Sequence, residues 1–190
     1  MIGKRDDINR VAGMYIMLTK KGIFYFSDTT LNIDPSAEEL ADIAILTSDV
    51  VKFFDTEPKV AMLSYSNFGS TKGIVPEKAA KAARIVKSRR PDVLIEGEMQ
   101  ANVALDSALQ KTLYPFSELA NSGANTLIFP DLASGNIAYK LLMELGGAEA
   151  IGPILMGMNK PVHVLQQGSS VRDIINMVSI AVIDAQQNDK

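Results

Sequence analysis

Strand-like and helix-like segments alternate along most of the chain, and this alternation restricts the possible folds more than any other feature. Alternation of this kind is typical of parallel strands joined by crossover helices. The sequence therefore predicts an α/β fold in three layers, with a mainly parallel sheet between helices. The predicted strands are residues 59–63, 93–95, 126–129, 153–156 and 162–165, and the predicted helices are residues 34–50, 76–88, 134–145 and 170–186.

A β-hairpin is expected before this alternating region. Residues 14–19 and 23–26 have β-type composition, and they flank Lys20-Lys21-Gly22. That tripeptide suits a tight turn because glycine adopts strained backbone angles easily. The two runs should therefore pair antiparallel at the start of the fold.

The charge of the chain and its missing residue types exclude several classes of function. With a formal net charge of -3, the chain has no basic field that would attract nucleic acid or an anionic membrane. It contains no cysteine, so disulfides, thiolate catalysis and cysteine-bound zinc are excluded, and the single His163 cannot form a histidine-rich metal site. No stretch reaches the roughly 18 apolar residues of a membrane span, and no signal-peptide pattern is present, so we expect a cytoplasmic protein.

The loops that follow strands are the places to search for a site, because ligands of parallel α/β sheets bind beyond the carboxyl ends of the strands. The first such loop, residues 64–73, supplies the hydroxyls of Ser64, Ser66 and Ser70 and the ammonium group of Lys72. Together with backbone amides freed by glycine, these groups suit a phosphate or the pyrophosphate of CoA. The spacing is not that of a Walker loop, and an ordinary polar turn is the alternative.

A second loop follows the predicted strand 126–129 and opens a helix. Asp131 is placed to cap that helix, Gly135 admits a close approach to the backbone, and Asn136 adds an amide side chain. These residues suit a ligand, but capping alone also explains them.

A third polar loop precedes the last predicted helix. Gln166, Gln167 and Ser169 supply amide and hydroxyl groups for a ligand. Ser170 and Asp173 are three residues apart, which resembles a capping box with aspartate in the glutamate position and would be a structural role. A catalytic role for Asp173 therefore needs support from outside the spacing.

Two glutamates near a predicted strand end have the spacing of a metal or acid–base pair. Glu96 and Glu98 are two residues apart and would project to the same side of an extended strand. No histidine or third carboxylate is close in sequence, so exposed surface glutamates are the favoured interpretation. His163 is similarly interpreted as a packed or surface histidine, and we expect no metal site.

Several colinear blocks resemble a known family, the phosphate acetyltransferases. The resemblance runs from residue 34 to the C-terminus, and the N-terminal hairpin fits it as well. It implies a fold like that of isocitrate and isopropylmalate dehydrogenases. The matching blocks are PSAEELADIAI at 35–45, KVAMLSYS at 59–66, PDVLIEGEMQ at 91–100, IFPDL at 128–132, GNIAYK at 135–140, GGAEAIGPIL at 146–155 and NKPV at 159–162.

The resemblance also implies that part of the usual molecule is absent. Members of the family are much longer and have an active cleft between two lobes. Residues 1–190 resemble the C-terminal lobe together with the final helix, residues 170–186, that returns to the other lobe. The chain is accordingly interpreted as a fragment of a longer protein.

The motif at residues 65–70 looks most like the phosphotransacetylase-like domain fused to bacterial NADP-dependent malic enzymes. That resemblance implies a domain that binds acetyl-CoA or CoA, regulates the parent enzyme and helps to assemble a homodimer or higher oligomer. The parent would oxidatively decarboxylate malate to pyruvate. Its NADP and divalent metal would lie on an N-terminal malic enzyme domain, and no cofactor is expected within this chain.

Departures from the family pattern suggest that the transferase chemistry is lost. Active members carry Ser-Arg-Gly where this chain has Gln166 and Gln167 before glycine, and an arginine where it has Glu144. Asp173 matches the family's catalytic aspartate. Losing charged donors from a site that must hold phosphate removes charge-assisted hydrogen bonds and should leave little turnover.

Three functions therefore stay open. The first is a regulatory acetyl-CoA-binding domain of malic enzyme. The second is an active phosphate acetyltransferase, which interconverts acetyl-CoA and phosphate with acetyl phosphate and CoA. The resemblance implies that Asp173 is the base when the CoA thiolate attacks acetyl phosphate. The third is a structural dimerisation module that uses the apolar helix around residues 174–183.

Overall fold

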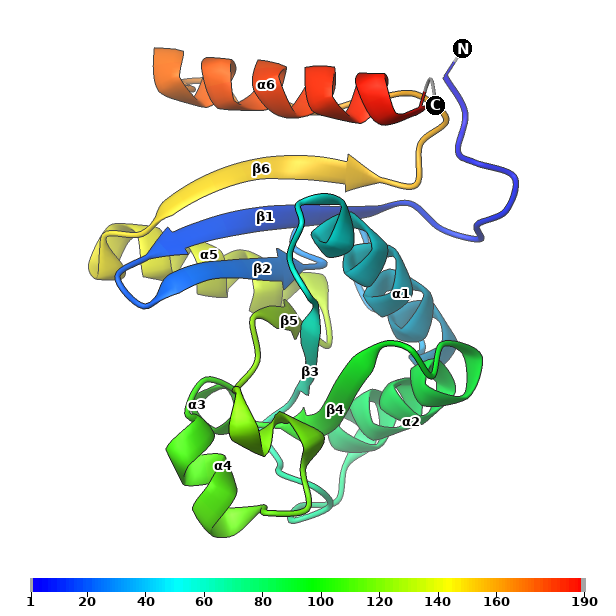
Figure 1. Ribbon diagram of the computed structural model, residues 1–190, viewed down its shortest axis with the longest axis vertical. Helices are drawn as coiled ribbons and strands as arrows, with labels where there is room; N and C mark the ends of the chain where they lie inside the picture. Colours follow the sequence, from blue (N-terminus) through cyan, green and yellow to red (C-terminus); the bar gives the residue numbers. More distant parts are fainter. Residues whose placement is uncertain (1, 189–190) are drawn as a thin grey trace.

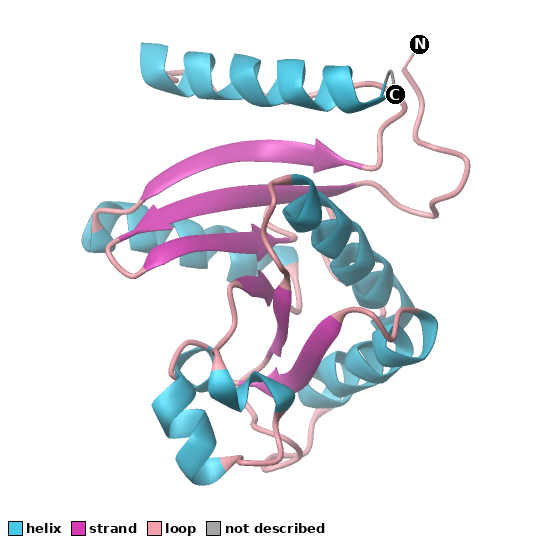
Figure 2. Cartoon of the chain, in the orientation of Figure 1, coloured by secondary structure: helices cyan, strands magenta, loops and turns pink. Residues whose placement is uncertain are grey.

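The computed structural model describes residues 2–188, which form a six-stranded mixed sheet with helices on both faces (Figures 1 and 2). The order of the strands across the sheet is β4-β3-β5-β2-β1-β6. The predicted three-layer α/β arrangement is therefore confirmed. The strands are β1 (Ala12–Thr19), β2 (Gly22–Ser27), β3 (Lys59–Leu63), β4 (Leu94–Met99), β5 (Thr126–Ile128) and β6 (Glu149–Met156). The helices are α1 (Ala37–Phe53), α2 (Ile74–Arg89), α3 (Ala101–Ala104), α4 (Ser107–Leu113), the 3-10 helix η1 (Glu118–Asn121), α5 (Leu132–Gly146) and α6 (Val171–Asn188).

Strand β1 is what makes the sheet mixed. It pairs antiparallel with β2 on one side and with β6 on the other, whereas β2, β5, β3 and β4 pair parallel with one another. The turn at Lys20 and Lys21 joins β1 to β2, with Thr19 opposite Gly22. The carboxyl ends of β2, β3, β4 and β5 consequently lie at one edge of the sheet.

Residues 162–165, which the sequence suggests as a strand, do not form one. His163 makes a single bridge to Ile154 beside the edge strand β6, and the neighbouring residues are irregular. Pro161 has no backbone N–H to donate to a ladder, and the chain must turn away at Gly168 to begin α6. The predicted strand 153–156 is, by contrast, the second half of a longer strand, β6.

The sheet is buried on both faces. Along β1, Met14 and Ile16 point into a core covered by α1 and α2, while Tyr15 and Met17 point into a second core under α5, α3 and α4. This alternation follows from the period of two in a strand. Both cores are largely aliphatic, which fits a sheet whose strands read as continuous apolar runs.

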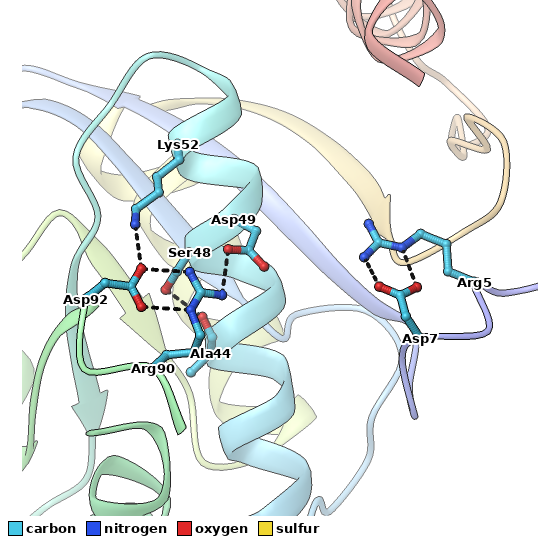
Figure 3. Close-up of polar contacts among 8 residues, drawn as sticks. All are labelled: Arg5, Asp7, Ala44, Ser48, Asp49, Lys52, Arg90 and Asp92. Carbon is cyan, nitrogen blue, oxygen red and sulfur yellow. Dashed lines mark hydrogen bonds and ion pairs between the residues drawn. The ribbon is translucent and has the colours of Figure 1, made fainter. Parts of the chain in front are cut away.

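An ion-pair cluster joins α1 to the segment between α2 and β4 (Figure 3). The guanidinium of Arg90 donates two hydrogen bonds to Asp92, both of 2.8 Å, and another of 2.9 Å to Asp49 on α1. Lys52 pairs with the same Asp92 carboxylate at 3.0 Å. These hydrogen bonds, Arg90 first, hold the pKa of Asp92 below its usual value.

Helix α6 lies along the outer side of β6 (Figure 1). Its inner face buries Met177 and Ile180 in the core shared with α1. Its outer face is also apolar, and the exposed side chains there include Val171, Ile175, Val178 and Val182. Over residues 2–188, none of the helices is both long and apolar enough to cross a membrane.

Candidate functional site

The loop after β3, predicted as a phosphate cradle, closes around a buried carboxylate. Glu98 on β4 is 3% exposed. Its Oε1 accepts a hydrogen bond of 2.9 Å from the hydroxyl of Ser66 and one of 2.6 Å from the amide of Gly69. The hydroxyls of Ser66 and Ser70 lie 3.2 Å apart.

The backbone amides of this loop also have partners within the protein. Ser66 N–H donates to the hydroxyl of Ser64, Asn67 N–H to Ser70, Phe68 N–H to the carbonyl of Glu98, and Thr71 N–H to Ser66. An anion would have to replace these bonds and approach a carboxylate. Lys72 is exposed ahead of α2. The hydroxyls of Ser64, Ser66 and Ser70 are thus engaged within the protein, and binding of CoA or phosphate by this loop stays a prediction.

The second predicted loop fixes α5 to the end of β2. Asp131 caps α5 by accepting from Ser134 N–H at 2.7 Å. A Cβ added at Gly135 would lie 2.6 Å from the carbonyl oxygen of Asp28, so only glycine permits this approach. Asn136 donates to the carbonyl of Thr29 at 3.3 Å. These three residues position the helix.

The third loop forms one wall of a pocket between α5, β6 and α6. The pocket has a volume of about 190 Å³. Gln166, Gln167, Ser169 and Asp173, all predicted from the sequence as site residues, line it. Gly168 of the same loop also lines the pocket, and the remaining wall consists of Tyr15, Tyr139, Met143, Ala150, Ile151, Gly152, Asn176 and Met177.

Two tyrosines that the sequence does not single out form the inner wall of this pocket. The rings of Tyr15 on β1 and Tyr139 on α5 stack with centroids 4.2 Å apart and an interplanar angle of 21°. The side-chain amide of Gln166 donates a hydrogen bond of 3.1 Å to the hydroxyl of Tyr15. Burial, followed by the contact with Tyr139, raises the pKa of Tyr15, so its hydroxyl stays protonated and neutral.

Asp173 forms the capping box that its spacing predicts. Its carboxylate accepts 2.8 Å hydrogen bonds from both the amide and the hydroxyl of Ser170, and its own amide donates to that hydroxyl at 3.2 Å. The hydrogen bond from the Ser170 hydroxyl is the main cause that lowers the pKa of Asp173. Asp173 therefore caps α6 and lines the pocket at the same time.

Other predicted candidates lie apart from the pocket. Glu96 pairs with Lys87 at 3.0 Å and its side chain is 12% exposed, whereas Glu98 is buried with Ser66, so the two glutamates do not act as a pair. The interpretation of both as exposed surface glutamates is therefore wrong. Glu144 is exposed on α5 and does not line the pocket. The side chain of His163 is 5% exposed, and it packs beneath α6 with its Nε2 3.8 Å from Asp184.

Comparisons with known proteins agree on one family. The family model described as phosphate acetyl/butaryl transferase matches residues 1–182. A phosphate acetyltransferase from Clostridium acetobutylicum is 44% identical over 93% of this chain and 55% of its own length. An NADP-dependent malic enzyme from Haemophilus influenzae is 43% identical over 98% of this chain and 25% of its own length.

Solved structures give the same picture. The structure of a phosphotransacetylase from Streptococcus pyogenes superposes with a TM-score of 0.89 at 40% identity, and the match covers 99% of this chain and 56% of that one. The chain thus spans about half the length of the transferase and a quarter of the length of the malic enzyme that it matches.

Proposed function

Because the chain belongs to the phosphate acetyl/butaryl transferase family, we propose that it is an acetyl-CoA-binding regulatory domain in which the transferase chemistry is lost. We further propose that it works as part of an NADP-dependent malic enzyme. The parent's malic enzyme domain would hold NADP and the divalent metal. The similarity to the Haemophilus influenzae malic enzyme supports this proposal. The match covers 25% of the length of that enzyme.

The observation that carries the proposal is the chemistry of the pocket wall. Among the described residues that line it, there is one carboxylate, Asp173, and there is no lysine or arginine. Its polar groups are otherwise neutral amides and hydroxyls, from Gln166, Gln167, Asn176 and Ser169. Neutral amides pair well with the amides of a pantetheine arm, and the thioether and aromatic surfaces suit its alkyl chain and thioester.

The same wall is a poor place for phosphate or acetyl phosphate. A multiply charged anion requires charge-assisted hydrogen bonds from cations, and Asp173 would repel it. Gln166 and Gln167 stand in place of the serine and arginine of active family members, and their side-chain amides carry no charge. We therefore propose that a thioester ligand binds and that transfer of its acetyl group to phosphate does not follow.

An active phosphate acetyltransferase is the alternative, with Asp173 as the base that takes a proton from the CoA thiol. Hydrogen bonds from Ser170 lower the pKa of Asp173, which weakens it as a base.

Calorimetric titration with acetyl-CoA tests the proposal. Met143→Trp should block the pocket because Met143 lines it, and it should abolish the binding heat. Ile137→Trp is the matched control, because Ile137 is on the same helix but is 57% exposed and does not line the pocket. Failure of the unmodified chain to bind acetyl-CoA, or equal binding by both variants, would refute the proposed site.

The outer face of α6 favours a second function, which is self-association. Val171, Ile175, Val178 and Val182 are spaced alternately by four and three residues, and each is at least 49% exposed. This is the spacing of an a/d seam in a helix pair. We propose that the seam contributes to a homodimer or higher oligomer.

A further inference from the structure

The hydroxyl of a β1 tyrosine reaches the loop that precedes α6. Tyr15 is 5% exposed, and its ring stacks on Tyr139. At the far end of the ring, its oxygen accepts the 3.1 Å hydrogen bond from Gln166 Nε2. This bond joins positions 151 residues apart in sequence, so it connects the central sheet directly to the start of α6.

The Tyr15 ring also lies close to the backbone of the neighbouring strand. A Cβ at Gly152 on β6 would lie 2.7 Å from the Tyr15 ring, and the φ of +152° at this position also favours glycine. The ladder between β1 and β6 shifts register between Met14 and Ile16, which places this irregularity next to Tyr15. Contacts with Tyr139 and with the backbone of β6 therefore restrict the ring, and its hydroxyl is held in place.

The loop that this hydroxyl contacts is held together by its own hydrogen bonds. The carbonyl oxygen of Gln166 accepts from the amide of Ser169 at 3.1 Å and from its hydroxyl at 2.8 Å. The backbone amide of Gln166 donates a hydrogen bond of 3.1 Å to the Ser169 hydroxyl. Because these hydrogen bonds hold residues 166–169 together, a single contact at the Gln166 side chain sets the position of the whole turn.

From this geometry we propose that Tyr15 is a positioning residue for ligand binding: its hydroxyl holds Gln166, and through it the turn of residues 166–169, over the pocket. The ligand class, an acyl thioester of CoA whose neutral pantetheine arm meets this pocket, rests on the function proposed above. A turn held in place loses less conformational entropy when the ligand binds, so the anchor raises affinity without touching the ligand.

Two tyrosine-to-phenylalanine substitutions separate positioning from simple stability. Tyr15→Phe keeps the stacked ring and removes the acceptor of Gln166. Tyr25→Phe is the matched control, since Tyr25 is also buried and its hydroxyl bonds to Thr56 at 3.2 Å, in a part of the fold that does not line the pocket. Both should lower thermal stability by similar amounts.

Affinity for acetyl-CoA should separate them. Tyr15→Phe should weaken binding by roughly three- to tenfold, as expected for one lost neutral hydrogen bond, and Tyr25→Phe should leave it unchanged. Gln166→Leu should weaken binding, and adding Tyr15→Phe to it should cause no further loss, because one interaction is removed twice. Additive losses, or an equal effect of Tyr15→Phe and Tyr25→Phe, would overturn the proposal.

Hydrogen exchange tests the anchor even if acetyl-CoA proves not to bind. In the free protein, Tyr15→Phe should speed exchange of the Ser169 amide by several-fold relative to Tyr25→Phe, because the turn is released from the sheet. Unchanged exchange would contradict the positioning role. Faster exchange in a chain that does not bind acetyl-CoA would retain the anchor and refute only the proposed ligand.

Discussion

The hydroxyl of Ser66 donates a 2.9 Å hydrogen bond to the carboxylate of Glu98, which joins the loop after β3 to the neighbouring strand β4. The same carboxylate oxygen accepts from the amide of Gly69. Glu98 therefore takes the place that an external anion would occupy in a phosphate-binding loop. The loop after β3 is organised by the protein's own charge.

Replacing Glu98 should destabilise the fold to a degree that depends on the acceptor that remains. Glu98→Ala removes the buried oxygen that accepts from the Ser66 hydroxyl and the Gly69 amide, and it should cost about 1–3 kcal/mol in the free energy of unfolding. Glu98→Gln should cost less, because its amide oxygen can keep both bonds. Urea denaturation measures the two values. Equal losses for both variants would show that the acceptor oxygen is not what matters.

Stability should fall in mild acid because of His163. Burial lowers the pKa of His163, and the charge of Asp184 only partly opposes this shift. The unfolded chain therefore binds a proton at a higher pH than the folded one. The stability that neutral, buried His163 contributes is fully present above the pKa of histidine in the unfolded chain, about 6.5, and is lost as the pH falls below that value.

A variant without the imidazole isolates the contribution of His163 to the pH dependence of stability. His163 is the single histidine in the chain, so His163→Leu removes the imidazole that titrates in this range. The unfolding midpoint of the unmodified protein should drop more between pH 8 and pH 5.5 than that of the variant. Parallel pH profiles would contradict the buried, neutral state of His163.

Gly152 should be intolerant of a side chain for steric reasons beyond its backbone angle. Gly152→Ala places a Cβ 2.7 Å from the Tyr15 ring and should cost about 1–3 kcal/mol or more. Gly147→Ala is the control, because Gly147 has φ +64° but no atom lies within 4 Å of the place its Cβ would take, and it should cost only about 1–2 kcal/mol. Thermal unfolding of both proteins checks the order, and a reversed order would contradict the packing of Tyr15 on β6.

Self-association through α6 predicts a dependence on its outer seam. Val178→Asp puts a charge in the centre of the exposed apolar face and should shift a dimer to monomer in analytical ultracentrifugation. Ser179→Asp adds the same charge at the next position, outside the seam, and should leave the dimer intact. A chain that sediments as a monomer before any substitution would exclude this function for the isolated chain.

The arrangement of strands and helices could be predicted because local patterns determine it. Apolar runs such as residues 59–63 and 126–129 became β3 and β5, and the capping spacing of Ser170 and Asp173 marked the start of α6. The strand suggested at 162–165 was wrong, because pairing depends on a neighbour that the local sequence does not reveal.

The candidate site was only partly predictable for the same reason. Gln166, Gln167, Ser169 and Asp173 follow one another in sequence and could be found as one polar loop. Tyr15 and Tyr139 lie on separate elements that are distant from that loop in the sequence, and only the fold brings them to the pocket. The sequence around the serines of residues 64–70 does not reveal that Glu98, on another strand, accepts the hydrogen bond of Ser66.

The most direct test of the central claim is a thiol-detection assay for acetyl transfer, run on the chain under conditions where calorimetry shows acetyl-CoA bound. With acetyl-CoA and phosphate supplied, we expect no release of CoA thiol above the protein-free rate. Thiol release that disappears in Asp173→Asn would contradict this expectation, and would mean that the chain is an active phosphate acetyltransferase with Asp173 as its acid–base residue.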